Sequence, residues 1–143
     1  MSPSDGPLPG LDPPRSPMHS LLQATRVHRL HVGVALVGVV GLEPKRVLDL
    51  RWSQVDLEGE WIQHGSKRVP LASTVVGLLR WHAARQRLDR IRSVRWFGID
   101  EVLLDERGCR FSLQSADFVL EYYCEQAGLP AIPFSSLRHP CLR

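Results

Sequence analysis

Basic and aromatic side chains are concentrated in residues 90–98 of this 143-residue chain. Arg92 and Arg95 lie here beside the aromatic pair Trp96 and Phe97. Guanidinium groups bind phosphates through charged, forked hydrogen bonds, and aromatic rings can stack on exposed bases. The segment is therefore a candidate contact with nucleic acid. The alternative is that the two aromatic residues only cover an edge of the core.

The overall charge permits such a contact without requiring it. The formal net charge is +3 at pH 7, with 16 arginines and 2 lysines, and many globular proteins carry as much. A hydrophobic fraction of 43% is enough for one globular domain. The longest apolar run, residues 32–42, is shorter than the ~20 residues of a membrane span. With no signal pattern at the N-terminus, we expect a cytoplasmic protein that has no membrane partner.

The cysteines and histidines do not have the spacing of a metal site. Cys109, Cys124 and Cys141 form no Cys-x-x-Cys pair and have no histidine at zinc spacing. An odd number of cysteines also argues against a disulfide framework, so a reducing compartment is the default. We therefore expect neither a metal nor another cofactor.

Two stretches carry the most specific motifs. Residues 41–57 read GLEPKRVLDLRWSQVDL, and residues 129–139 end in Leu-Arg-His. The hairpin exit Val-Pro-Leu lies between them at residues 69–71. In order and spacing these motifs resemble the signature boxes of the tyrosine recombinases, the phage integrase family. The resemblance runs from about residue 21 to the end of the sequence.

This resemblance implies a mainly α-helical catalytic domain with a small antiparallel β-sheet, an α+β fold that is truncated at its C-terminus. In the family a tyrosine attacks a DNA phosphodiester while two arginines hold the phosphate oxygens. A hairpin lysine and a histidine assist proton transfer, and no metal is needed. By position, Arg138 corresponds to the second arginine and Lys67 to the hairpin lysine. A surface salt bridge for Arg138 and a solvated lysine at Lys67 are the alternatives.

The chain departs from the family at its catalytic positions. Glu43 stands where the first arginine is expected, and Arg46 stands at the family's glutamate position. A carboxylate facing a phosphate repels it. The alternative is that Glu43 only pairs with Arg46 on one helical turn, which is worth a few tenths of a kcal/mol. Ser135 replaces the family's histidine and is most simply a helix cap.

The nucleophilic tyrosine also has no counterpart. In the family it lies beyond the second arginine, whereas no tyrosine follows Arg138 in this sequence. Tyr122 and Tyr123 precede Arg138 in a predicted helix, and we expect core packing for them, with at least one facing the core.

The pattern of prolines and apolar residues predicts a disordered leader and one domain. Residues 1–17 hold six of the eleven prolines and form the leader, and residues 18–143 form the truncated domain. Apolar spacing predicts a helix over residues 19–40, buried in its second half and ended by Gly41. Pro44 then suits the first turn of the next helix.

The remaining elements follow from turns, alternation and caps. Strands are predicted over residues 55–57, 60–63, 67–71 and 102–104. Helices are predicted over residues 74–90, capped by Ser73, and over residues 113–127, capped by Ser112. The second of these helices should point Phe118, Val119 and Tyr122 inward. Ser135 or Ser136 should cap the turn that carries Arg138.

The leading hypothesis is a degenerate, DNA-binding relative of the integrases, left from a mobile element and without strand-transfer activity of its own. Its partner would be double-stranded DNA, bound weakly. The DNA contacts would be Arg138, Lys67, Arg92 and Arg95. Two alternatives stay open: an interaction module that docks on an intact recombinase protomer, and a decayed fragment with no selected function.

Overall fold

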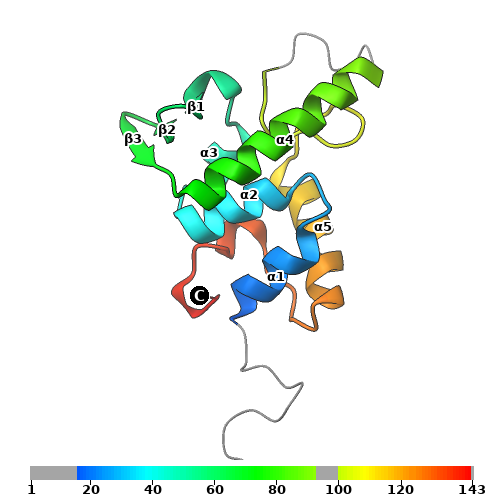
Figure 1. The fold of residues 1–143 in the computed structure, drawn as a ribbon. Coiled ribbons are helices and arrows are strands. Elements are labelled where there is room, and N and C mark those ends of the chain that lie inside the picture. The colour runs from blue at the N-terminus through cyan, green and yellow to red at the C-terminus, as the bar shows by residue number, and fades with distance from the viewer. Residues whose placement is uncertain (1–15, 93–99, 143) are drawn as a thin grey trace, which may run out of the picture.

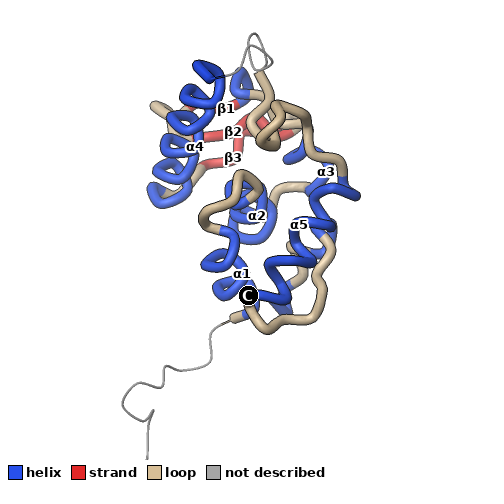
Figure 2. The backbone as a smooth tube through the Cα atoms, turned by 90° about the vertical axis from the view of Figure 1, so that its right-hand side faces the viewer, coloured by secondary structure: helices blue, strands red, loops and turns tan. Residues whose placement is uncertain are grey.

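The described part of the chain is mainly helical, with a small antiparallel sheet at one side (Figures 1 and 2). The computed structural model describes residues 16–92 and 100–142. Its helices are α1 (Pro17–Thr25), α2 (His31–Ala35), the π-helical turn η2 (Leu36–Val40), α3 (Pro44–Leu48), the 3-10 turn η3 (Trp52–Gln54), α4 (Ser73–Arg92), α5 (Leu113–Gln126), and the 3-10 turns η5 (Phe134–Ser136) and η6 (Pro140–Leu142). Its strands are β1 (Val55–Asp56), β2 (Trp61–His64) and β3 (Lys67–Pro70). The predicted fold class is therefore confirmed.

The centre of the fold is the segment formed by α2 and η2. Every residue from 31 to 38 is buried, and the side chains of Val34, Leu36 and Val37 are fully inaccessible. Gly41 ends the segment in the left-handed conformation, with φ 89°, which glycine adopts at little cost. The buried second half and the glycine stop are thus as predicted.

The single N-terminal helix of the sequence prediction is wrong, because the chain leaves the helix after Thr25. The Thr25 hydroxyl donates to the carbonyl of Leu21 at 2.9 Å and lies 3.1 Å from Nδ1 of His31. Nδ1 of His28 accepts the N–H of Leu30 at 3.0 Å. Such side-chain bonds compete with the helical ladder. They allow α1 and α2 to pack against each other as two separate helices (Figure 1).

α1 begins at Pro17, the last residue of the predicted leader. The Ser16 hydroxyl accepts the N–H of His19 at 3.1 Å, and Pro17 takes the first helical position, where its missing N–H costs nothing. The rest of the predicted leader, residues 1–15, lies outside the described residues.

The three strands form one antiparallel sheet in the order β1-β2-β3, close to the predicted ranges. Ile62 is the buried centre of the sheet and pairs with Val55 on one side and Val69 on the other. Pro70 ends the edge strand β3, where its missing N–H is tolerated.

α4 packs on the core through Val75, Leu79 and His82, as its apolar spacing predicts, although the helix includes Ser73 rather than being capped by it. Nε2 of His82 lies 2.6 Å from the carbonyl oxygen of Val102, and burial lowers the pKa of His82. No helix within residues 16–92 and 100–142 is both long and apolar enough to cross a membrane.

The strand predicted over residues 102–104 is not present. The carbonyl oxygen of Val102 is bonded to side chains of α4 and not to a neighbouring strand. It lies close to His82, as described above, and it also accepts a hydrogen bond from the Gln86 side chain at 2.9 Å. The neighbouring backbone forms only two single bridge pairs, between Arg51 and Glu101 and between Leu104 and Arg110. Residues 102–104 are nevertheless fully buried.

α5 starts as predicted but presents a different face to the core. The Ser112 hydroxyl accepts the N–H of Ser115 at 3.1 Å and caps the helix. Phe118 and Tyr122, predicted to face inward, are 76% and 56% exposed. The helix buries instead a row spaced by four residues: Ala116, Leu120 and Cys124. Two of these side chains are small, so the helix can approach the core closely.

The close contact at Gly33 gives a stability prediction. A Cβ at Gly33 would lie 2.8 Å from Cδ1 of the fully buried Leu103. We expect Gly33→Ala to lower the free energy of unfolding by about 1–3 kcal/mol, because overpacking a filled core forces its neighbours to move. Urea unfolding measures the change.

The control is Gly77→Ala in α4, where an added Cβ meets nothing within 4 Å. This variant should raise stability by up to about 1 kcal/mol, since alanine is the better helix former. Equal effects of the two substitutions would show that Gly33 is not a point of close packing.

Candidate functional site

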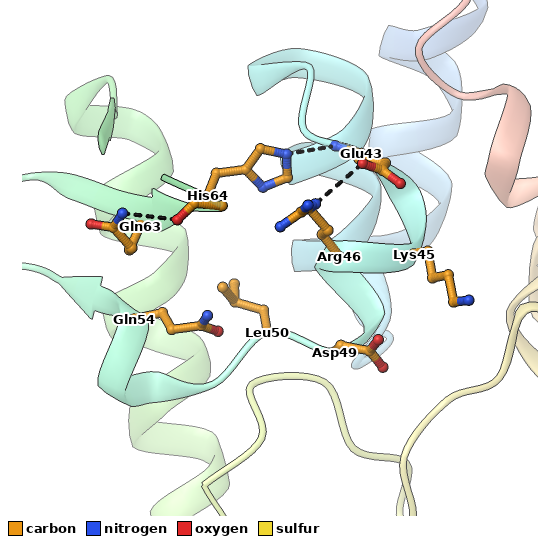
Figure 3. Close-up of a pocket in the computed structure, with 9 residues that line it drawn as sticks. Glu43, Lys45, Arg46, Asp49, Leu50, Gln54, Gln63 and His64 are labelled. Carbon is orange, nitrogen blue, oxygen red and sulfur yellow. Dashed lines mark hydrogen bonds and ion pairs between the residues drawn. The ribbon is translucent and has the colours of Figure 1, made fainter. Parts of the chain in front are cut away.

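A polar cleft of about 380 Å³ lies between α3 and the β2–β3 hairpin (Figure 3). Its walls come from α3, from the segment after it, and from the end of β2. The lining residues are Glu43, Lys45, Arg46, Asp49, Leu50, Gln54, Gln63, His64 and Gly65. The cleft thus contains the first motif of the sequence, and the hairpin provides its opposite wall.

Glu43 is the residue before α3, and it binds both walls of the cleft. Its carboxylate accepts a hydrogen bond from Nε of Arg46 at 3.2 Å. Its backbone N–H donates to Nε2 of His64 at 3.3 Å (Figure 3). The predicted pairing of Glu43 with Arg46 is confirmed. The bond to His64 ties the start of α3 to the end of β2.

The hairpin turn fits closely over the Arg46 guanidinium. Gly65 has φ +65°, and a Cβ built on it would lie 3.2 Å from Nη1 of Arg46. The side chain of Gln63 donates to the Gly65 carbonyl at 3.0 Å and steadies the turn. Glycine suits this position for two reasons: it adopts a positive φ at little cost, and its lack of a side chain leaves room for the Arg46 guanidinium.

The surroundings of His64 favour its neutral form, because its pKa is lowered. Burial first, and then the Arg46 guanidinium, lower the pKa of His64, while Glu43 opposes this and Arg138 adds to it. Since Nε2 accepts the Glu43 N–H, the ring proton sits on Nδ1. The turn η5, which precedes Arg138, contacts α3, so the second motif lies beside this wall of the cleft.

The charges inside the cleft largely cancel in pairs. Glu43 neutralises Arg46, and the Asp49 carboxylate accepts a hydrogen bond from the Arg110 guanidinium at the cleft's edge. Lys45 is exposed at the rim. The interior of the cleft is therefore close to neutral.

The turn that carries Arg138 is held by α5. Phe134 and Leu137 are fully buried, so the turn is anchored in the core while Arg138 stays exposed. Oδ1 of Asp117, in α5, accepts the N–H of Phe134 at 2.7 Å. The predicted cap at Ser135 or Ser136 is wrong, because both serines lie inside the 3-10 turn η5 and Asp117 takes the capping role.

The hairpin brings further cations to the same region. Lys67 is exposed and pairs with His64 across the hairpin. The next residue, Arg68, places its guanidinium 4.3 Å from the centre of the Trp61 ring. Sequence analysis missed His64 as a member of the site. The Gly65-Ser66 turn was the available signal, since it sets His64 opposite Lys67.

Other candidate residues lie elsewhere. α4 starts next to β3 (Figure 1). The helix is 20 residues long and ends at Arg92, so Arg92 lies about 30 Å from its start at a rise of ~1.5 Å per residue. Arg95, Trp96 and Phe97 lie outside the described residues. Lys67 and Arg138 do not line the cleft itself, but Lys67 lies opposite its residue His64 and Arg138 follows the turn η5, which contacts α3. Arg92 lies far from both.

The tyrosines belong to α5 and do not line the cleft. Tyr123 is half-buried against the core, with its ring centre 5.5 Å from that of His28, so the expected core packing is confirmed for this residue. The Tyr122 ring lies edge-on to Tyr123 at 5.0 Å and is mostly exposed. Within the described residues, His, Cys, Asp and Glu side chains form no cluster of three or more that could hold a metal ion.

Comparison with known proteins places this geometry in a recombinase-like fold. No family model matches the sequence, and no curated protein matches it. The chain is similar to the crystal structure of XerA recombinase, with a TM-score of 0.72 and 20% sequence identity. The match covers 97% of this chain and 49% of that one, so the chain spans about half the length of that recombinase. The predicted recombinase-like fold is confirmed.

The contact between Asp117 and Phe134 gives a prediction on the site. Asp117→Ala should lower the free energy of unfolding by about 1–2 kcal/mol, because it removes a charged acceptor from a buried N–H. Hydrogen exchange of the Phe134 amide should become faster, since this bond holds the turn that carries Arg138.

Asp105→Ala is the matched control. Oδ1 of Asp105 accepts the N–H groups of Arg107 and Cys109 in another turn. Its loss should leave exchange at Phe134 unchanged. If Asp117→Ala also leaves that amide protected, Asp117 does not position the Arg138 turn.

Proposed function

We propose that this chain binds double-stranded DNA along the rim of the cleft and does not cut it on its own. The observation that carries the proposal is the group of exposed cations around a nearly neutral cleft. Lys67 and Arg68 project from the hairpin, Arg138 from the turn after η5, and Lys45 from α3. The recombinase-like fold supports a role related to DNA recombination.

The rim cations suit a phosphate backbone better than a single small anion. They come from three separate elements, so they can contact successive phosphates of a duplex. Each neutralised phosphate releases condensed counterions, and this gives affinity without sequence preference. Weak, salt-dependent binding follows from so few contacts.

The interior of the cleft explains the expected lack of cleavage. Glu43 stands at the position of the family's first arginine and pairs with the Arg46 guanidinium, so neither a first-box arginine nor an unpaired Arg46 is available to join Arg138 in holding a phosphate in the transition state. Ser135 replaces the expected histidine, and a serine hydroxyl does not ionise near neutral pH, so it is a poor general acid or base. We therefore propose that the chain is a DNA-binding relative of mobile-element integrases that does not transfer strands on its own.

The salt dependence of binding tests the rim. Arg138→Ala should weaken duplex binding and lower the log–log salt slope by about 1, because one phosphate contact is lost. Arg92→Ala removes an equal charge at the far end of α4 and should leave the slope unchanged. Fluorescence anisotropy with labelled duplex at several salt concentrations measures both.

Nicked recombination substrates should give no covalent adduct on a denaturing gel. Two results would contradict the proposal: no duplex binding at low salt, or an adduct that is lost in Tyr122→Phe or Tyr123→Phe.

Exchanging the charges in the cleft tests the role of Glu43. The double variant Glu43→Arg with Arg46→Glu keeps the net charge and the pairing on one turn. It places a forked donor where the carboxylate now stands. We expect duplex affinity to rise several-fold to about tenfold at low salt, with the unfolding midpoint nearly unchanged and still no adduct.

The matched control exchanges an ion pair outside the cleft. Glu58 and Arg80 lie 3.7 Å apart, and Glu58→Arg with Arg80→Glu also conserves net charge. This swap should not raise affinity. If the exchange at Glu43 and Arg46 has no effect while the fold is intact, Glu43 does not face the DNA.

A further inference from the structure

A second hollow, unrelated to the cleft, lies between residues 26–31 and α4. Its volume is about 490 Å³, and it shares no lining residue with the cleft. It is lined by Arg26, Val27, His31, Leu78, Trp81 and Arg85. We call it the α4 groove.

The α4 groove is apolar with a basic edge. Val27 and Trp81 are 65% and 52% exposed and line the same hollow, so they form an apolar patch rather than isolated exposed residues. The Arg85 guanidinium donates to the Val27 carbonyl at 3.0 Å and lies 5.5 Å from the centre of the Trp81 ring. Burial first, and then the positive charge of Arg29, lower the pKa of Arg85. The charged form of Arg85 is thus disfavoured by its surroundings, and a carboxylate beside it would stabilise that form.

The groove continues along one face of α4. Leu78, Trp81, Arg85, Leu88 and Arg92 follow one another at alternating spacings of three and four residues. This spacing keeps them on the same side of the helix. Leu88 is 54% exposed, so the apolar surface extends past the groove itself. A long, straight partner such as a helix fits this surface better than a compact ligand.

The exposed face of α5 has the complementary composition. Phe118, Glu121, Tyr122 and Glu125 lie at positions i, i+3, i+4 and i+7, so they share one side of the helix. All four are exposed. This α5 face is therefore aromatic and acidic, whereas the α4 groove is apolar and basic.

We propose that the α5 face of one copy of this chain packs into the α4 groove of a second copy. The aromatic rings of Phe118 and Tyr122 would cover Val27 and Trp81. The carboxylate of Glu121 or Glu125 would lie against the basic edge. Two uncovered apolar surfaces on one small domain are typical of association, and their opposite charges steer each to the other.

A second copy explains the α4 groove better than DNA does. A phosphate backbone would satisfy Arg26 and Arg85 but would leave Val27 and Leu78 facing polar groups. The acidic helix face meets both requirements, and it is present on this same chain. The area available is limited, so the complex should be weak and should weaken further as salt is added.

Sedimentation equilibrium of the full chain over a dilution series at low salt tests the proposal. The wild-type protein should associate reversibly. Trp81→Ala and Phe118→Ala should each weaken association at least about tenfold, because exposed aromatic residues that become buried are typical hot spots. Val39→Ala is the control, since Val39 is 50% exposed but belongs to neither surface, and it should associate like the wild type. Unfolding midpoints confirm that the variants are folded.

Mixing complementary variants distinguishes this pairing from a general loss of solubility or fold. Trp81→Ala keeps an intact α5 face and Phe118→Ala keeps an intact groove, so an equimolar mixture should form a 1:1 complex that neither forms alone. Arg26→Glu and Glu121→Arg should each weaken association and restore it when mixed, because the exchanged charges attract again.

Three outcomes would overturn the proposal. The wild-type chain could stay monomeric at the highest attainable concentration. The three alanine variants could associate equally. Trp81→Ala could lower duplex affinity without changing association, which would assign the α4 groove to nucleic acid instead.

Discussion

The fold depends on burying residues 31–38 on every side. A helix with apolar side chains on every side has no face suited to water, so other elements must cover it all round. α1, α4 and α5 cover it, together with residues 102–104 and the buried side chains of the turn after Pro133. Because Gly33 has no side chain, Leu103 and Phe134 can come close to the segment. The polar groups that could act on a ligand are therefore displaced to the periphery, on the hairpin, on α3 and on the Arg138 turn.

Local patterns in the sequence predicted the elements whose ends are set by neighbouring residues. Gly41, the Ser112 cap and the three strands belong to this class, because turn and cap chemistry acts within four residues. The break after Thr25 was missed, although its cause is also local. The apolar spacing continues across this break, so it predicted one helix and gave no sign of the side-chain hydrogen bonds made by Thr25 and His28. The prediction of the inward face of α5 was wrong for a different reason. It rested on the large aromatic residues, whereas the small residues Ala116 and Cys124 determine which face packs on the core.

The candidate site was predictable only in part. The pair Glu43 and Arg46 follows from helical spacing, and the structure confirms it. The proximity of His64, Lys67 and Arg138 depends on how the hairpin and the last turns meet α3, which no local pattern encodes. The cap at Phe134 comes from Asp117, 17 residues earlier in the chain. Long-range partners of this kind need the packed core, so sequence alone could not supply them.

The ion pair between Glu43 and Arg46 has a consequence for how such a chain can change over generations. The fold places both charges at the surface, where such a pair on one turn contributes only a few tenths of a kcal/mol in either order. Selection for folding alone therefore acts only weakly on the order. A lineage can exchange the two residues, or exchange them back, without passing through an unfolded protein. The order of the charges at this position can therefore change while the fold persists.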